Sequence, residues 1–388
     1  MDDDSRANRY LYFESSRGCP YRCAYCLSSL DNRVRNFSID YIKKQLKILE
    51  EKTPKQVKFL DRTFNSNPER ALEIASYIND LNVDTSFQFE VALEFFSPKL
   101  LEFFANTKKG KFRFEVGVQS FNDETLKSIR RYQNADKLTA NIHFLKQNDI
   151  VMHTDLIAGL PYEDYDSFKN SFFKLFSLKT DEIQMGILKL LKGTSLRSDC
   201  QKYAITYNEL PPYEVLSTAW ISKEEMDRIK LVAKVIDKTY NSKRLKETFD
   251  TLFIEGYDIF EIMADYGSRI VKIDKIQVYD YFMALYLTLE EFGYKDASRL
   301  ILNDYYKQFK EKPKALFERP DQEIRKDFYR YLISLGYDEH ELNEYSIFDH
   351  AYKNQKAIYQ LVTYSNKHHL QSIRYFDLDF NLIDIIYY

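Results

Sequence analysis

The stretch YLYFESSRGCPYRCAYC, residues 10–26, joins a run typical of a β-strand to a loop that holds three of the chain's four cysteines. Cys19, Cys23 and Cys26 lie close together in this loop, whereas Cys200 stands alone. An odd-numbered cluster in a chain without a signal peptide is a poor basis for disulfides. The loop therefore predicts a metal site.

The C-x3-C-x2-C spacing of these cysteines leaves two kinds of metal site open. A structural zinc ion takes four protein ligands, usually from paired C-x2-C units, and the chain has no second pair. A zinc site would therefore need a distant histidine. A 4Fe–4S cluster accepts cysteine thiolates, and three of them leave one iron open. The residue types favour the cluster, with zinc as the alternative.

Beyond the loop, apolar runs of strand length alternate with stretches of helical periodicity. Strands are expected at residues 10–16, 56–64, 86–93, 111–120, 150–161 and 182–191, and helices at 38–52, 68–81, 97–106, 122–132, 135–148 and 163–178. Ser38 is the expected N-cap of the first helix, and Pro68 begins the next. Six such strands predict a parallel α/β architecture, either a doubly wound sheet or a barrel. In both, the chemistry belongs at the C-terminal ends of the strands.

The pattern changes after residue 195. Helical segments with many aromatic residues follow as far as about residue 350, and their spacing predicts a packed core rather than a base-stacking surface. Alternating apolar residues near the end predict a terminal β-hairpin around Asn366. The expected domains are a disordered N-terminus at 1–9, an α/β domain at 10–195, a connector at 196–221 and a mainly α-helical C-terminal domain at 222–388.

Composition narrows the class of protein. The 388 residues carry 56 Lys and Arg against 59 Asp and Glu, a formal charge of −3, so the overall charge does not favour general nucleic-acid binding. No apolar run approaches the length of a membrane helix, and the N-terminus lacks the apolar region of a signal peptide. A cytoplasmic protein without a membrane partner is expected.

The cysteine loop resembles the defining motif of the radical S-adenosylmethionine (SAM) superfamily, C-x3-C-x-aromatic-C, with Tyr25 at the aromatic position. The segments FRFEVGVQSFNDETLKSIRR (112–131) and HTDLIAGLP (153–161) resemble the oxygen-independent coproporphyrinogen oxidase-like branch. The segment ESSRGCPYRCAYCLSS (14–29) resembles cobalamin-binding radical SAM proteins. The resemblance implies a partial (β/α)6 TIM-like barrel over about residues 10–195.

In that superfamily the three cysteines hold a 4Fe–4S cluster whose open iron chelates SAM. One electron from the cluster then cleaves SAM to methionine and a 5′-deoxyadenosyl radical, which abstracts a hydrogen atom. The resemblance therefore implies that Cys19, Cys23 and Cys26 bind a metal cluster, and that SAM is the second cofactor.

Carried over position by position, the resemblance also implies SAM contacts. Glu90, at the end of the third strand, matches a SAM-contacting carboxylate. Gln119, Arg131 and Asp155 match residues that bind SAM in the coproporphyrinogen oxidase-like branch. An aspartate at a strand end accepts hydrogen bonds from ribose hydroxyls, and an arginine clamps a carboxylate. Tyr25 is expected near the adenine.

One motif departs from the family pattern. The glycine-rich stretch that usually follows the second strand is replaced by residues 60–63, LDRT, so Asp61 or a backbone carbonyl is expected to contact the SAM amino group. His153 is interpreted as a packed side chain rather than a base, and Cys200 as an inert thiol. No catalytic side chain is assigned.

The resemblance also sets the expected partners. Relatives usually carry a cobalamin-binding domain ahead of the radical SAM domain, and this chain begins almost where that domain would end. Either the protein lacks the domain or the sequence is a fragment. No Asp-x-His-x-x-Gly cobalamin signature occurs, so no cobalamin is expected in this chain. The expected partners are an unidentified substrate, an electron donor of the flavodoxin or ferredoxin type, and a separate cobalamin-binding protein.

The expected function is that of an anaerobic radical SAM enzyme acting on an unidentified substrate. The alternatives are a non-catalytic iron–sulfur or zinc module and an RNA-modifying radical SAM enzyme. Formation of 5′-deoxyadenosine from SAM separates the enzyme from the non-catalytic module.

Overall fold

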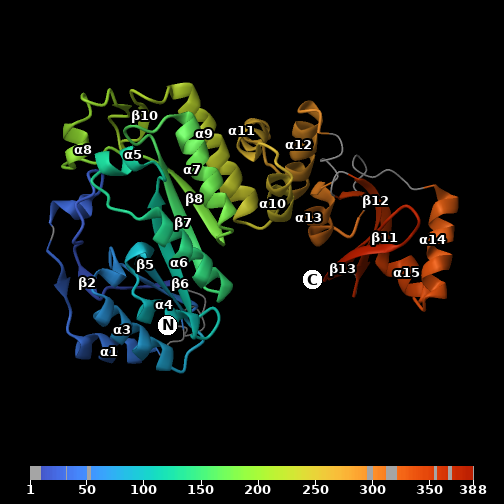
Figure 1. The fold of residues 1–388 in the computed structure, drawn as a ribbon, viewed down its shortest axis with the longest axis horizontal. Helices are drawn as coiled ribbons and strands as arrows, with labels where there is room; N and C mark the ends of the chain where they lie inside the picture. The colour runs from blue at the N-terminus through green and yellow to red at the C-terminus, as the bar shows by residue number, and fades with distance from the viewer. Residues whose placement is uncertain are drawn as a thin grey trace. The chain divides into compact units, whose positions relative to one another are not determined.

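The computed structural model describes residues 10–31, 33–49, 54–294, 300–311, 321–353, 356–365 and 369–387. The chain divides into two compact units, Met1–Ala233 and Lys234–Tyr388 (Figure 1). The predicted disordered segment 1–9 and the predicted hairpin turn at Asn366 lie outside the described residues.

Six strands form the sheet of the first unit. They are β1 (Tyr10–Phe13), β4 (Gln56–Phe59), β5 (Ser86–Val91), β6 (Phe112–Gln119), β7 (Val151–Ala158) and β8 (Glu182–Ile187). Their order across the sheet follows the chain, β1-β4-β5-β6-β7-β8, and each pairing is parallel. A doubly wound sheet reverses its strand order at a switch point, and this sheet does not. The predicted partial barrel is therefore confirmed over the doubly wound alternative.

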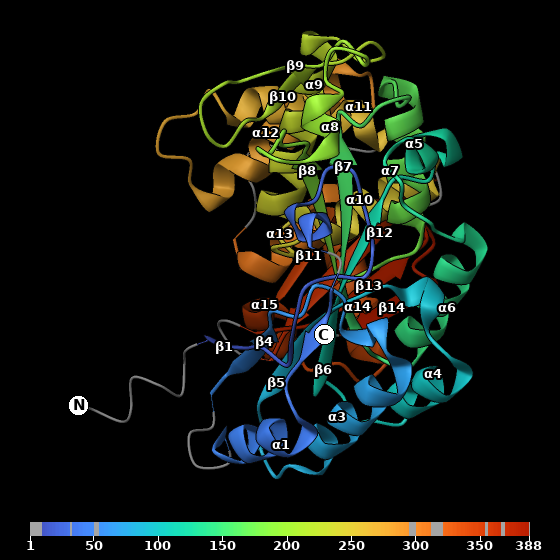
Figure 2. The ribbon, with the colours of Figure 1, turned by 90° about the vertical axis from the view of Figure 1, so that its left-hand side faces the viewer.

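Helices follow the strands along one side of the sheet. They are α1 (Ile39–Lys47), α3 (Pro68–Asp80), α4 (Pro98–Ala105), α5 (Asp123–Ser128), α6 (Ala135–Gln147) and α7 (Tyr165–Ser177). Right-handed crossovers between neighbouring parallel strands place successive helices on the same side. Figure 2 shows α1, α3, α4 and α6 one after another there. The predicted starts are confirmed, because Ser38 caps α1 by accepting from the Tyr41 amide at 3.3 Å and Pro68 opens α3.

The two faces of the parallel sheet differ in polarity. On the face toward the helices, large apolar side chains such as Phe87, Phe89, Phe112 and Phe114 are almost completely buried. The alternate residues face the inside of the half-barrel and are only partly buried. We call this inside the lumen. Its inner-facing residues include Lys58, Gln88, Glu90, Arg113, Glu115, His153, Asp155, Glu182 and Gln184.

The remainder of the first unit is irregular, and helices open the second. The elements are α8 (Ser195–Ser198), β9 (Thr206–Tyr207), β10 (Val215–Ser217), α9 (Lys223–Val235), a π-helical turn (Ile236–Tyr240), α10 (Lys246–Ile254), α11 (Ile259–Ile270), α12 (Val278–Glu291), α13 (Ile301–Gln308), α14 (Gln322–Ser334) and α15 (Glu339–Tyr345). Phe282 and Leu289 on α12 are fully buried, which confirms the predicted aromatic helix core. No helix in the described part of the chain has the length and apolarity that crossing a bilayer requires.

The second unit ends in a four-stranded antiparallel sheet. Its strands, in order across the sheet, are β11 (Ser346–Lys353), β12 (Lys356–Tyr364), β13 (Leu370–Phe376) and β14 (Leu382–Tyr387). The predicted hairpin is the central pair β12–β13. The expectation of helix as far as residue 350 is wrong from 346 onward, because β11 pairs along its whole length with β12.

Candidate functional site

The cysteine loop turns sharply just ahead of its first cysteine. Gly18 has a φ of +94°, and a Cβ atom there would lie 2.2 Å from the backbone oxygen of Arg33. The short pair β2 (Ser16–Arg17) and β3 (Arg35–Asn36) brings these two segments together. Only glycine fits this approach, so Gly18 fixes the direction in which Cys19 leaves the turn.

The middle of the loop is held by its backbone. The Ala24 amide donates to the Ile129 carbonyl at 2.8 Å, and the Ala24 carbonyl accepts from the Leu196 amide at 3.0 Å. Ala24 is buried and packs in one apolar cluster with Ile129 and Leu196. These contacts fix Cys23 and Tyr25, on either side of Ala24, relative to the end of α5.

Asp61 holds the beginning of the loop. Its carboxylate accepts three hydrogen bonds, from the Ser15 amide at 2.8 Å, the Ser15 hydroxyl at 2.6 Å and the Ser16 hydroxyl at 2.6 Å. Asp61 is almost completely buried and does not line the cavity that contains the cysteines. The expectation that Asp61 contacts SAM is therefore corrected, because both of its oxygens are engaged in tying the loop to the end of β4.

The other predicted residues line one cavity of about 240 Å³. They are Cys19, Cys23, Cys26, Tyr25, Glu90, Gln119, Arg131 and Asp155. In the described residues, no group of three or more His, Cys, Asp or Glu side chains is arranged to hold one metal ion. Thiolates that bind three different irons of one cluster need not converge on a single point. The three thiols line one cavity, which is compatible with ligands to three irons of one cluster.

The end of β6 presents Gln119 to this cavity. The register with β7 shifts between Gly117 and Gln119, and Gln119 has a φ of +68°. A Cβ atom at Gly117 would lie 2.3 Å from Nε2 of Gln119 and 3.7 Å from Nη2 of Arg131. Gln119 is 9% exposed, and its Oε1 has no hydrogen-bond partner among the described residues. A buried oxygen left unpaired at a cavity wall indicates a polar ligand.

Arg131 is locked in place beneath Gln119. Its guanidinium donates to the Gly117 carbonyl, and its Nε donates to Oε1 of Gln133 at 3.3 Å. Gln133 in turn donates to the Ser120 carbonyl at 3.1 Å. This network connects the end of β6 to the segment that follows α5, so Gln119 and Arg131 are positioned together.

Arg131 is also the main positive charge beside the cysteines. Burial raises the pKa of Cys23, and Arg131 opposes that rise. Burial alone would lower the pKa of Arg131, but Tyr25, Cys23 and Glu94 raise it above its ordinary value. Glu94 is 4% exposed and lies just after β5. Sequence reasoning missed Glu94, since a lone glutamate after a strand carries no recognisable signal.

Three aromatic rings form one wall of the cavity. The rings of Tyr21 and Phe95 stack with their centroids 5.6 Å apart, and Phe95 stacks on Tyr132 at 6.0 Å. Tyr132 is 73% exposed although it lines the cavity. This wall was not predicted, because its members come from three separate loops. It offers a flat apolar surface of the kind on which a heteroaromatic base stacks.

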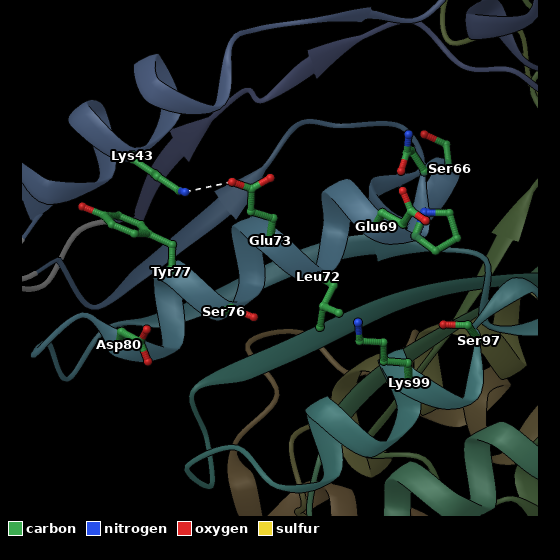
Figure 3. Close-up of a pocket in the computed structure, with 12 residues that line it drawn as sticks. Lys43, Ser66, Glu69, Leu72, Glu73, Ser76, Tyr77, Asp80, Ser97 and Lys99 are labelled. Carbon is green, nitrogen blue, oxygen red and sulfur yellow. Dashed lines mark hydrogen bonds and ion pairs between the residues drawn. The ribbon is translucent and has the colours of Figure 1, made fainter.

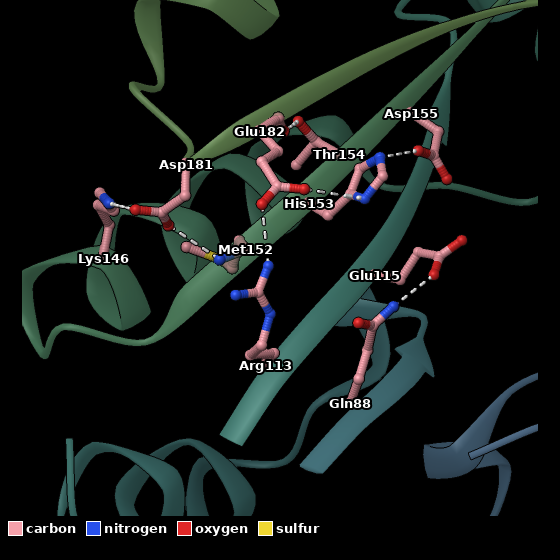
Figure 4. Close-up of polar contacts among 10 residues, drawn as sticks. All are labelled: Gln88, Arg113, Glu115, Lys146, Met152, His153, Thr154, Asp155, Asp181 and Glu182. Carbon is pink, nitrogen blue, oxygen red and sulfur yellow. Dashed lines mark hydrogen bonds and ion pairs between the residues drawn. The ribbon is translucent and has the colours of Figure 1, made fainter. Parts of the chain in front are cut away.

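Acidic side chains also line the cavity. Glu90 lies 3.8 Å from the Arg62 guanidinium, and burial together with Glu115 raises the pKa of Glu90 to about 7. Oδ1 of Asp155 lies 3.1 Å from Nε2 of His153, and the two form an ion pair when the histidine is protonated (Figure 4). Burial opposes the charge on His153, but Asp155 raises its pKa overall. The unpaired Oε1 of Gln119, beside the carboxylate of Asp155, shows that this cavity fits a polar ligand next to the three thiols.

A larger cavity lies elsewhere, on the outer surface of α1, α3 and α4 (Figure 3). It has a volume of about 1140 Å³ and is lined by helix side chains, among them the ion pair of Lys43 and Glu73 at 2.8 Å. None of the predicted site residues lines it. Cys200 does not line the cysteine cavity either, and packs against an apolar cluster that includes Leu196.

Comparison with known proteins assigns the first unit. Residues 13–175 match the family model of the Radical SAM superfamily. Residues 201–375 match a second model, described as a protein of unknown function (DUF4080). The chain therefore contains a radical SAM domain, which confirms the resemblance noted in the cysteine loop.

Individual relatives are distant. An uncharacterized methyltransferase of Pyrococcus horikoshii is 24% identical over 261 residues, which cover 66% of this chain and 54% of that protein. An oxygen-independent coproporphyrinogen-III oxidase-like protein of Bacillus subtilis is 26% identical over 98 residues, 25% of this chain and 20% of that protein. A solved radical SAM methyltransferase of Kitasatospora setae aligns with a TM-score of 0.47 and 14% identity, over 55% of this chain and 44% of that one. The chain spans about half the length of the Pyrococcus relative.

Proposed function

We propose that this chain is a radical SAM enzyme that binds a 4Fe–4S cluster through Cys19, Cys23 and Cys26 and binds SAM in the adjoining cavity. One observation carries the proposal. The three cysteines share a single cavity with Asp155 and with Gln119, whose buried Oε1 has no hydrogen-bond partner among the described residues. The cavity lies at the C-terminal ends of parallel strands, where such folds place their chemistry.

Cys19, Cys23 and Cys26 would hold a 4Fe–4S cluster with one open iron, and that cluster would supply the one electron that cleaves SAM to methionine and a 5′-deoxyadenosyl radical. The chain's own residues bind and orient. Asp155 accepts hydrogen bonds from the ribose hydroxyls, and Gln119 offers its free Oε1 to a second donor on SAM. Arg131 lies close enough to Cys23 for its positive charge to favour the thiolate. Tyr25 and Glu90 complete the enclosure of the cofactor.

The proposal also names cofactors and partners. The cluster needs a one-electron donor, which we propose is of the flavodoxin or ferredoxin type. We further propose that this chain binds no cobalamin, since its sequence has no Asp-x-His-x-x-Gly signature, and that any corrinoid is brought by a separate protein. A cytoplasmic location is part of the same proposal.

Cleavage of SAM tests the proposal directly. Anaerobically reconstituted protein, reduced with dithionite and supplied with SAM, is expected to form 5′-deoxyadenosine. Cys19→Ala is expected to form none, and Cys200→Ala is expected to form as much as the parent, because Cys200 lies outside the cavity. Protein with an intact cluster that forms no 5′-deoxyadenosine would instead be a non-catalytic iron–sulfur module.

Cobalamin binding is tested separately. After incubation with hydroxocobalamin, gel filtration is expected to separate the corrinoid from the protein. Stoichiometric co-elution would show that this chain holds a cobalamin site, and the cobalamin part of the proposal would be withdrawn.

A further inference from the structure

A second cavity, of about 560 Å³, occupies the lumen at the N-terminal ends of the strands. Its walls come from all six strands of the parallel sheet and are almost entirely polar. Glu115 lines both this cavity and the cysteine cavity, so the two adjoin along the lumen. Barrel interiors are normally filled by layers of branched apolar side chains. A polar cavity beside a cofactor cavity is instead the place for a polar ligand.

The charges of the lumen are sorted into two rows. The strand register aligns Lys58 with Gln88 and Gln88 with Arg113, which makes one row basic. Two residues further along the strands, the register aligns Glu90 with Glu115, Glu115 with His153 and His153 with Glu182. This second row is acidic and lies nearer the cysteines. A rise of about 7 Å along the strands separates the two rows.

Some of these charges are already paired. Arg113 donates to Glu182 at 3.0 Å, and Nδ1 of His153 lies 3.6 Å from Glu182 (Figure 4). The amide of Gln88 donates to Oε2 of Glu115 at 2.8 Å. These contacts fix the side chains of the wall, and the ion pair with Glu182 neutralises the charge of Arg113.

One charged side chain in each row has no ion pair with a Lys, Arg, Asp or Glu side chain of the described residues, although Glu115 also raises the pKa of its neighbour His153. In the described part of the chain no carboxylate forms an ion pair with Lys58, whose ammonium lies 5.2 Å from the centre of the Tyr10 ring. No Lys or Arg of the described residues forms an ion pair with Glu115, and the negative charge of Glu115 is among the causes that raise the pKa of Glu90. A ligand with a negative group at Lys58 and a positive group at Glu115 would neutralise both.

We infer that the lumen binds the substrate, and that the substrate carries an amino-acid-like pair of charges, its anionic group at Lys58 and its ammonium group at Glu115. The inference rests on the proposed function, because it names the substrate class of the same enzyme. The ammonium end lies next to the cofactor cavity, since Glu115 lines both cavities. The anionic end lies toward the N-terminal ends of the strands.

Three probes of similar size test the negative and the positive binding group separately. 4-Aminobutyrate carries both, butyrate only the negative one and butylamine only the positive one. Their dissociation constants are to be measured by saturation-transfer NMR titration on anaerobically reconstituted protein. 4-Aminobutyrate is expected to bind about fivefold more tightly than either analogue, because it forms one more partly buried ion pair than each of them.

Two substitutions assign each charge to its residue. Lys58→Met is expected to remove the preference for 4-aminobutyrate over butylamine, and Glu115→Gln to remove its preference over butyrate. Glu115→Gln keeps an oxygen that can accept from Gln88. Lys137→Met, on the exposed surface of α6, is the matched control and is expected to preserve both preferences. Equal binding of the three probes to the parent protein, or equal losses in Lys58→Met and Lys137→Met, would overturn the inference.

The same preparation separates this inference from the proposed function. Formation of 5′-deoxyadenosine needs no probe, and probe binding needs no SAM cleavage. Protein that cleaves SAM but binds the three probes equally refutes only the substrate class. Protein that prefers 4-aminobutyrate but forms no 5′-deoxyadenosine supports the charge-paired site and refutes the enzyme activity.

Discussion

The two large sheets of this chain use their faces differently. In the parallel sheet, one face of β6 is buried against helices while the other carries Arg113 and Glu115 into the lumen. In the antiparallel sheet, five successive residues of β12, 358–362, are all buried, so both faces of that strand are covered. A strand covered on both faces contributes packing, whereas a strand with one polar face can also hold a ligand.

Because the two sheets use their faces differently, substitutions in them are expected to affect different properties of the protein. Substitutions on the polar face of the parallel sheet and in the cysteine loop are expected to change what the protein binds. Substitutions in the core of the antiparallel sheet are expected to change how stably its unit folds.

The largest expected effect is the loss of the cluster. Cys19→Ala, Cys23→Ala and Cys26→Ala each remove one ligand from a three-ligand site. Reconstituted parent protein is expected to hold about four irons per chain and to absorb broadly near 400 nm, and each variant is expected to lose both signals. Iron analysis and absorbance spectroscopy measure the effect.

Cys200→Ala is the matched control for these variants. Cys200 packs against an apolar cluster and does not line the cysteine cavity, so its removal is expected to leave the iron content unchanged. Equal loss of iron in Cys200→Ala would mean that the three-ligand assignment is wrong.

The second effect belongs to the antiparallel sheet. Phe328 on α14 is fully buried, and its ring lies 4.5 Å from that of Phe348 and 4.8 Å from that of Phe376. Phe328→Ala is expected to lower the free energy of unfolding of the second unit by about 3–5 kcal/mol, because it leaves a cavity among these rings. Urea unfolding followed by circular dichroism measures the loss.

The iron content of Phe328→Ala sharpens the comparison. Below its unfolding transition the variant is expected to reconstitute as many irons as the parent, since Phe328 contributes packing and no cluster ligand. A variant that stays folded but fails to take up iron would contradict the separation of stability from binding.

A smaller effect is expected on SAM affinity. Gln119→Ala and Asp155→Ala each remove an oxygen that lines the cavity, and each is expected to weaken SAM binding by about 1–3 kcal/mol while the cluster stays intact. Anaerobic equilibrium dialysis with SAM measures the affinity. Gln184→Ala is the matched control, because Gln184 lines the cavity at the N-terminal ends of the strands and not the cavity with the cysteines. Unchanged SAM affinity in both site variants would refute their assignment.

Much of this site could be predicted from sequence, because its residues occupy fixed places in a repeated unit. Gln119 and Asp155 stand near the ends of β6 and β7, where a parallel sheet collects its functional side chains. The C-x3-C-x2-C spacing of the cysteines by itself indicates a metal site. Gln119 and Asp155 were carried over from the resemblance to the radical SAM superfamily, and their places near strand ends agree with that assignment.

The features of the structure that were predicted wrongly or missed depend on contacts between segments that are distant in the sequence. Asp61 was expected to contact SAM, but its hydrogen bonds to Ser15 and Ser16 connect residues 46 and 45 positions away, which no local pattern reveals. The stacked wall at Tyr132 and the buried Glu94 were missed for the same reason. In the second unit, helical segments were expected as far as about residue 350. Residues from 346 onward form β11 instead, because their pairing with β12 outweighs their local preference.

The last expected effect is a pH dependence of stability, and it again contrasts the two units. Glu163, just after β7, is 1% exposed and accepts from the Ser120 hydroxyl at 2.5 Å, while its Oε2 has no hydrogen-bond partner among the described residues. Burial raises the pKa of Glu163 from 4.5 to about 8. Between these values the folded chain binds a proton that the unfolded chain does not. Stability therefore falls as pH rises from about 4.5 to about 8 and then levels off.

Glu163→Gln is expected to abolish this fall, because the amide keeps the acceptor for Ser120 and cannot ionise. Urea unfolding is expected to show that the parent loses stability relative to the variant between about pH 4.5 and about pH 8, and that the difference is constant above that range. Asp304 in the second unit is the matched case: burial raises its pKa from 3.8 to about 6, against the hydrogen bond from the Thr248 amide. Its contribution is complete by about pH 6, so the difference between Asp304→Asn and the parent is expected to stay constant above that value. If Glu163→Gln followed the parent across this range and Asp304→Asn diverged from it, the buried carboxylate that governs stability near neutral pH would lie in the second unit and not beside the site.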